Sequence, residues 1–153
     1  SASPAASLPA NCESAYSPAM LATLHAETPP LNDPGITLLS SDQAGLLELL
    51  ETVPTLRCTW GPPGPSGLAT TVSIVDAAQA EDVLSQLATA GFGCEASGDL
   101  EICSVEQRGI TLDDQEYVRG ETHAVGKGVW VATAWINVLP DGYAQDVVDT
   151  VAG

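Results

Sequence analysis

The sequence predicts an α+β fold, an antiparallel sheet of about five strands with helices packed on one face. Two observations support it: short segments that alternate polar and apolar residues between turn residues, and longer segments with apolar residues at helical spacing. They follow one another in the order ααββαβββα, and the short connections between consecutive strands favour antiparallel pairing. With 153 residues, 44% of them hydrophobic, the chain has the size and composition of one globular domain.

The first helix follows a lead of small residues. Residues 1–11 (SASPAASLPAN) are rich in serine, alanine and proline and predict a flexible tether, so the single domain is expected at 12–153. Ser17 precedes Pro18, a combination typical of a helix N-cap and first turn. The proline-rich segment 27–35 ends this helix, because proline lacks a backbone donor and fixes φ.

Capping motifs mark two further helices. Ser40-x-x-Gln43 and Asp76-x-x-Gln79 both have the spacing of a capping box, and each precedes apolar residues at helical spacing. Gly91 ends the second of these helices. A last helix is expected within PDGYAQDVVDTVAG. The strands are expected near 56–60, 68–75, 100–107, 116–124 and 129–139.

The chain is strongly acidic. It has 20 Asp and Glu against 4 Lys and Arg, a formal net charge of −16. Nucleic-acid binding needs cationic side chains that displace phosphate counterions, so this function is excluded, and anionic lipid surfaces are disfavoured for the same reason. The acidity indicates either a cationic partner or calcium, or solubility in a secreted or salt-tolerant setting. No apolar run approaches the ~20 residues of a transmembrane helix.

The four cysteines, Cys12, Cys58, Cys94 and Cys103, predict two disulfides. None forms Cys-x-x-Cys, and neither histidine lies at zinc-finger spacing from them, so disulfides in an oxidising compartment are favoured over metal binding. Of the three possible connectivities, we favour Cys94–Cys103, which closes a short loop around EASGDLEI, and Cys12–Cys58, which ties the N-terminal segment to the first strand.

The segment LRCTWGPPGPSG contains the first strand and the bend that follows it. Alternation along the strand puts Cys58 and Trp60 on the core face and Arg57 and Thr59 outside. The bend Gly61–Gly67 contains three prolines and three glycines, and its prolines stiffen the backbone by fixing φ. We interpret it either as a hairpin connector or as an exposed recognition or inhibitory loop, whose stiffness would reduce the entropy lost on binding.

The last hairpin brings candidate binding residues together. If Gly126–Gly128 is a three-residue turn, counting outward pairs Arg119 with Trp135 and places Tyr117, Arg119, His123 and Trp135 on one face. An arginine opposite a tryptophan predicts a cation–π contact. This face is either a ligand platform or an ordinary solvated sheet face, and a two-residue turn would shift the register and separate the four residues.

No catalytic residue, metal site or cofactor is predicted. Asp113, Asp114 and Glu116 form a compact acidic turn that either holds calcium or is simply solvated, and the twelve-residue calcium-loop pattern is absent. The sequence also lacks Gly-x-Ser-x-Gly, His-Glu-x-x-His, a Walker loop and Gly-x-Gly-x-x-Gly. If all four cysteines are oxidised, no thiol nucleophile remains.

Several features are spread over most of the chain: the Ser/Ala/Pro lead, the cysteine in LPANCES, the Cys-x-Trp strand in LRCTWG, the cysteines of GFGCEASGDLEIC, and the closing VWVATAWINVLPDGYAQDVVDTVAG. In these features the chain resembles secreted lipoproteins and cell-wall-associated domains of actinobacteria. The resemblance implies an extracytoplasmic α+β domain with two disulfides. CTWGPPGPSG is also similar to the cysteine–proline stretch of Streptomyces subtilisin inhibitors, although the spacing of the other cysteines differs.

These observations predict an extracytoplasmic, non-enzymatic binding or interaction domain, secreted or at the cell surface, for a protein or small-molecule ligand. A lipid anchor upstream of Ser1 would fit the tether-like lead. Three alternatives stay open: a secreted protease or toxin inhibitor acting through Gly61–Gly67, a subunit of a surface assembly, and a hydrolase with a site near His123.

Overall fold

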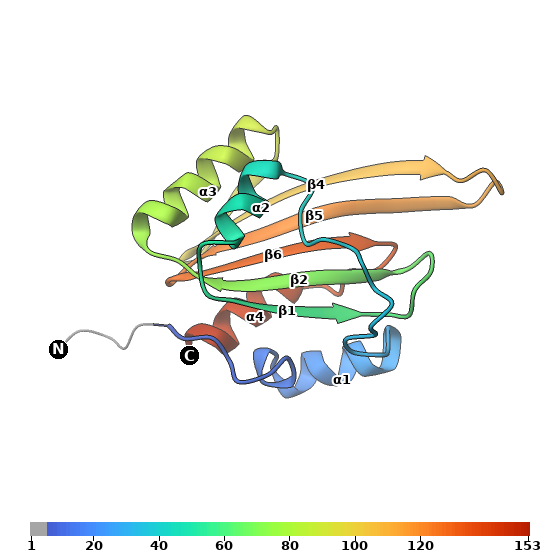
Figure 1. Ribbon diagram of the computed structural model, residues 1–153, viewed down its shortest axis with the longest axis horizontal. Helices are drawn as coiled ribbons and strands as arrows, with labels where there is room; N and C mark the ends of the chain where they lie inside the picture. Colours follow the sequence, from blue (N-terminus) through green and yellow to red (C-terminus); the bar gives the residue numbers. More distant parts are fainter. Residues whose placement is uncertain (1–5) are drawn as a thin grey trace.

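The computed structural model describes residues 6–153, and Figure 1 shows the order of their elements. The helices are η1 (Glu13–Ala15), α1 (Pro18–Glu27), α2 (Ala44–Leu50), α3 (Ala77–Thr89) and α4 (Tyr143–Ala152). The strands are β1 (Thr55–Trp60), β2 (Gly67–Ile74), β3 (Gly93–Ser97), β4 (Leu100–Ile110), β5 (Glu116–Gly126) and β6 (Val129–Ile136).

The six strands form one sheet in the order β1-β2-β6-β5-β4-β3, and every neighbouring pair is antiparallel. The predicted α+β class with an antiparallel sheet is therefore confirmed, with six strands rather than about five. The additional strand is β3, whose sequence GCEAS is exposed throughout and contains no β-branched or large apolar residue. It pairs with β4, to which a disulfide joins it.

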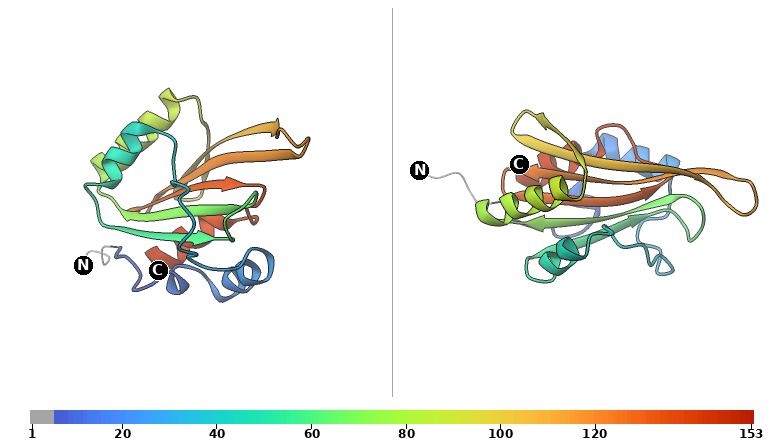
Figure 2. Two further views of the ribbon diagram at one scale, coloured as in Figure 1. Left: turned by 45° about the vertical axis from the view of Figure 1, so that its right-hand side comes forward. Right: turned by 90° about the horizontal axis from the view of Figure 1, so that it is seen from above.

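Helices cover both faces of the sheet, so the prediction that they pack on one face is wrong (Figure 2). Successive residues of β6 alternate between two cores. Trp130 and Ala132 share one core with residues of α2 and α3, and we call this side the α3 face. Val129 and Val131 share the other core with residues of α1 and α4, on the α4 face. The unbroken apolar start of β6, VWVA, is typical of a strand buried on both sides.

Both predicted disulfides are present. Cys12–Cys58 ties the chain just before η1 to β1, over a sequence separation of 46. Cys94–Cys103 joins residues that lie directly opposite each other on β3 and β4, at a separation of 9. No free cysteine occurs in residues 6–153.

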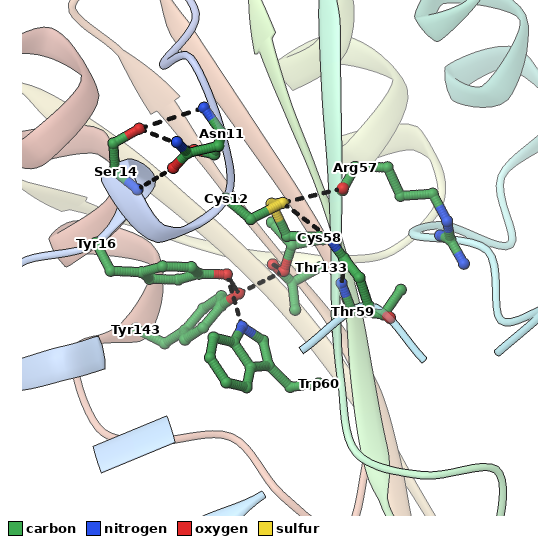
Figure 3. Close-up of a disulfide and its surroundings, with 12 residues drawn as sticks. Asn11, Cys12, Ser14, Tyr16, Arg57, Cys58, Thr59, Trp60, Thr133 and Tyr143 are labelled. Atoms are coloured by element: carbon green, nitrogen blue, oxygen red, sulfur yellow. Dashed lines mark hydrogen bonds between the residues drawn. A yellow bond between two sulfur atoms is a disulfide. The ribbon is translucent and has the colours of Figure 1, made fainter. Parts of the chain in front are cut away.

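Trp60 is buried as predicted and starts a chain of polar groups inside the α4-face core (Figure 3). Its indole N–H donates to the Tyr16 hydroxyl at 3.0 Å. That hydroxyl lies 2.7 Å from the hydroxyl of Tyr143, which in turn lies 2.7 Å from Oγ1 of Thr70. Burial raises the pKa of both tyrosines, so the chain links neutral hydroxyls and needs no counterion.

Two predictions about the N-terminal part need correction. Residues 1–5 of the predicted tether lie outside the described residues, but Ala6 and Leu8 pack against the α4-face core, so the tether does not extend to them. Thr59 was expected outside and is buried. The reason is that Asn32 lies beside β1, where its backbone N–H donates to the Thr59 carbonyl and its side chain accepts from the Thr59 N–H.

Only one of the two predicted capping boxes forms. Asp76 and Gln79 cap α3 reciprocally, as expected. At α2 the N-cap is Gln43, without a side-chain cap. Ser40 is buried and lies 2.8 Å from Thr71 Oγ1 on β2, so its hydroxyl is used in a tertiary contact instead of a local one.

Candidate functional site

The turn between β5 and β6 decides which residues share a face. It consists of two residues, Lys127 and Gly128, and both have positive φ. Such a turn matches the twist of the flanking strands. Arg119 therefore lies opposite Ile136 and not Trp135. The predicted three-residue turn is wrong, and every pair is shifted by one residue.

This shift separates the four predicted binding residues. Trp135 packs on the α4 face, where its indole N–H donates to Thr122 at 3.3 Å, so no cation–π pair with Arg119 forms. Tyr117, Arg119 and His123 share the α3 face. His123 is fully buried, Arg119 is exposed, and Tyr117 lies on the hairpin that reaches beyond β6 (Figure 2). They do not form the platform that the sequence predicted.

A chain segment crosses the α3 face and brings polar groups together there. We call residues 36–43, which run over the sheet toward α2 in Figure 1, the crossing segment. Ser41 donates its hydroxyl proton to Oε1 of Glu121 on β5 at 2.7 Å. The backbone N–H of Asp42 donates to Oε2 of the same carboxylate at 2.9 Å. A carboxylate in the sheet thus fixes the segment.

His123 is the third partner of this carboxylate. It lies two residues after Glu121 on the same face of β5, and its Nε2 is 3.0 Å from Oε1. The indole of Trp130 donates to Nδ1 at 3.1 Å. Because an indole N–H can only donate, Nδ1 carries no proton and Nε2 must carry it. His123 is therefore neutral and donates to an ionised Glu121.

Glu121 is held ionised although it is buried. Burial raises the pKa of its carboxyl, but the hydrogen bonds from His123, Ser41 and the N–H of Asp42 lower it by more, with a smaller electrostatic contribution from His123 in the same direction. The net pKa lies below the ordinary value of 4.5. The site thus contains a negative charge that is stabilised mainly by hydrogen bonds.

A cleft of about 280 Å³ opens beside this carboxylate, between the crossing segment, β4 and β5. Glu121 forms part of its wall. At its rim, the guanidinium of Arg119 pairs with Asp42 at 2.9 Å, and both side chains are exposed. Side chains from Gln43, Glu106 and Gln107 also line it. The apolar lining comes from Leu38, Ala90, Phe92, Val105, Ala134, Trp135 and Ile136.

A second hollow has no buried ionised side chain in its wall. It has about 390 Å³ and lies along the projecting hairpin, next to Tyr117, Arg108 and Asn137. All of its lining residues are exposed or only partly buried. The smaller cleft, with a buried ionised wall, is therefore the better candidate for a specific site.

The other predicted sites are placed as follows. Asp113, Asp114 and Glu116 are exposed at the tip of the β4–β5 hairpin. No group of three or more His, Cys, Asp or Glu in residues 6–153 is arranged to hold a metal ion. The bend Gly61–Gly67 joins β1 to β2, and the side chain of Asn137 donates to the carbonyl of Pro65 at 3.0 Å, which braces it.

No family model, curated protein or solved structure matches this chain. Within residues 6–153, none of the helices combines the length and apolar character that a bilayer crossing requires.

Sequence reasoning singled out His123 but missed Glu121 and Ser41, the other central residues of this site. Glu121 and His123 are two residues apart on β5 and therefore share one face of the strand. That spacing was the one local signal for this site in the sequence. Ser41 lies 80 residues from Glu121, and no pattern in the sequence connects them. The contact depends on a chain segment without regular structure crossing the sheet.

Proposed function

We propose that the protein is an extracytoplasmic binding domain without catalytic activity, and that the cleft between the crossing segment, β4 and β5 is its ligand site. The observation that carries the proposal is an ionised carboxylate, Glu121, in the wall of an open cleft without a matching cation. Its donors are in place in the free protein, so binding would require little reorganisation. Two disulfides support an oxidising compartment.

The charges favour a cationic ligand group. Arg119 pairs with Asp42, and Glu106 in the lining pairs with Arg108 at 3.7 Å. His123 is neutral, which leaves Glu121 as the uncompensated charge of the cleft. Oε1 of Glu121 accepts two hydrogen bonds and Oε2 accepts one, so Oε2 retains an acceptor position. The net charge of −16 would attract a cation from longer range. A primary amine or a guanidinium meets these conditions.

The same hydrogen bonds speak against a hydrolase at His123. Nδ1 accepts from Trp130 and Nε2 donates to Glu121, so neither nitrogen is free to take a proton from a substrate. Ser41 donates to Glu121 and not to His123. The three residues therefore lack the nucleophile–base contact of a catalytic triad.

Titration with N-acetyl-arginine methylamide, followed by ¹H–¹⁵N NMR, tests the proposal. We expect a Kd of roughly 1 mM, the range for one side chain in an open cleft. The amide signals of Asp42, Arg119 and Glu121 should shift most. Glu121→Gln, which removes the charge and keeps the shape, should abolish the shifts.

Two controls make the result specific. N-acetyl-glutamine methylamide has a similar backbone and no charge, and it should not bind. Glu116→Gln removes a carboxylate from the exposed hairpin tip and should leave the titration unchanged. Equal shifts with the neutral amide, or unchanged binding by Glu121→Gln, would refute a cation site in the cleft.

A further inference from the structure

β4 is longer than β3 and leaves part of the sheet edge open. β3 pairs with Leu100–Ser104. Among the described residues, 105–110 therefore have a strand partner only on the β5 side. Every residue of this stretch is exposed apart from Gly109, which is partly buried, and it belongs to the hairpin that projects at the right of Figure 1. An open strand edge is a template for another strand.

Alternate peptide groups along this stretch face away from the sheet. At the hairpin end, the N–H of Thr111 donates to the carbonyl of Gln115, in the register of the β4–β5 ladder. Odd-numbered residues of β4 therefore direct their peptide groups to β5. Because the direction alternates along a strand, those of Glu106, Arg108 and Ile110 face the open edge. They offer donors and acceptors to an incoming backbone.

The open edge borders the proposed cleft. Val105 and Gln107 line the cleft and lie opposite Glu121 and Arg119 on β5. An added strand would place alternate side chains on the same face, beside Val105 and Gln107. Strands lie ~4.8 Å apart, so such a side chain would start about 10 Å from the backbone of Glu121. An extended lysine or arginine spans the remaining distance to the carboxylate.

We propose that the cationic group belongs to an extended segment of a partner protein, which adds a strand antiparallel to residues 105–110 of β4 and directs a lysine or arginine into the cleft. This inference rests on the proposed function and names the class of partner. Backbone pairing supplies affinity, and the cleft selects the basic side chain.

A second copy of the chain does not fit this edge in the register that would match its charges. In a symmetric pair centred on Gln107, charges would match, because Glu106 of one copy would face Arg108 of the other. The same register would place Ile110 opposite Ser104 of the other copy. Ser104 is already paired with Gly93 of its own β3, so Ile110 and that β3 would occupy the same space. A free segment has no such obstacle.

The probe is the peptide acetyl-Thr-Val-Thr-Arg-Thr-Val-Thr-amide, whose arginine and valines share one face of a strand. We expect it to bind about tenfold more tightly than N-acetyl-arginine methylamide in calorimetric titration, because edge hydrogen bonds add to the side-chain contact. Hydrogen exchange of the amides of Glu106, Arg108 and Ile110 should slow when it binds.

Arg108→Pro and Arg108→Ala form a matched pair. Both remove the guanidinium, and only proline removes the outward N–H, which the β4–β5 ladder does not use. Arg108→Pro should weaken peptide binding about tenfold, and Arg108→Ala by less than about twofold. Both variants should bind N-acetyl-arginine methylamide like the wild type, which also shows that they are folded.

The outcomes separate this inference from the proposed function. If the peptide binds no more tightly than the amide, or if the two variants bind the peptide equally, strand addition is overturned and the cation site stands. If neither the amide nor the peptide binds, the proposed function fails together with the inference.

Discussion

Replacing both Cys12 and Cys58 by alanine is expected to lower the free energy of unfolding by about 4 kcal/mol. The bridge spans a separation of 46 residues, and a cross-link restricts the unfolded chain more when the closed loop is longer. It also holds the chain before η1 against β1, next to the buried Tyr16 and Trp60 (Figure 3). Chemical denaturation of the wild type and the double variant measures the difference.

The second bridge provides a matched control. Replacing Cys94 and Cys103 by alanine opens a separation of 9 residues and should cost about 2.7 kcal/mol in the same account. Both bridges tie a segment to a strand of one sheet, so loop length is the main difference between them. Equal losses, or a larger loss at the short loop, would mean that effects in the folded state outweigh the restriction of the unfolded chain.

Glu121→Ala is expected to destabilise the protein by roughly 3 kcal/mol at pH 7, because buried donors lose their acceptor. The hydroxyl of Ser41, the Nε2–H of His123 and the N–H of Asp42 all donate to this carboxylate. Glu116→Ala, at an exposed position, should change stability by less than about 0.5 kcal/mol. A loss no larger for Glu121→Ala than for Glu116→Ala in urea denaturation would show that the carboxylate does not fix the crossing segment.

The pH dependence gives an independent readout of the same carboxylate. Its pKa in the folded protein is below the ordinary 4.5, so the ionised form contributes stability that is fully present above that value. This stability is lost as the pH falls through the folded-state pKa. The stability advantage of the wild type over Glu121→Gln should be constant between pH 6 and 8 and shrink below about pH 4.5. An advantage that grows in acid would contradict the direction of the shift.

The parts of the fold that could be predicted have local signals. Asp76 and Gln79 mark the start of α3 within four residues, and the alternation around Cys58 and Trp60 predicts which side of β1 is buried. Cysteine spacing predicted both bridges. β3 was missed because its small and polar residues have no strand preference, and the pairing with β4 makes it a strand.

The candidate site could not be predicted, because it depends on one turn and one irregular segment. Lys127 adopts positive φ, which is unusual for lysine, and this choice shifts the whole β5–β6 register by one residue. Three of the four predicted binding residues remained on one face, and of the four, Arg119 and Trp135 line the cleft that we propose. Glu121, which was not among the predicted residues, is the residue at its centre.

The most direct test of this account is the protonation state of the His123 ring, read from its two ¹⁵N signals by NMR at pH 7. We expect a protonated Nε2 and an unprotonated Nδ1, the neutral form that leaves the cleft with the net charge of Glu121. Protons on both nitrogens would mean an imidazolium that neutralises the carboxylate. In that case the cleft would have no unmatched charge, and the reason to expect a basic ligand would disappear.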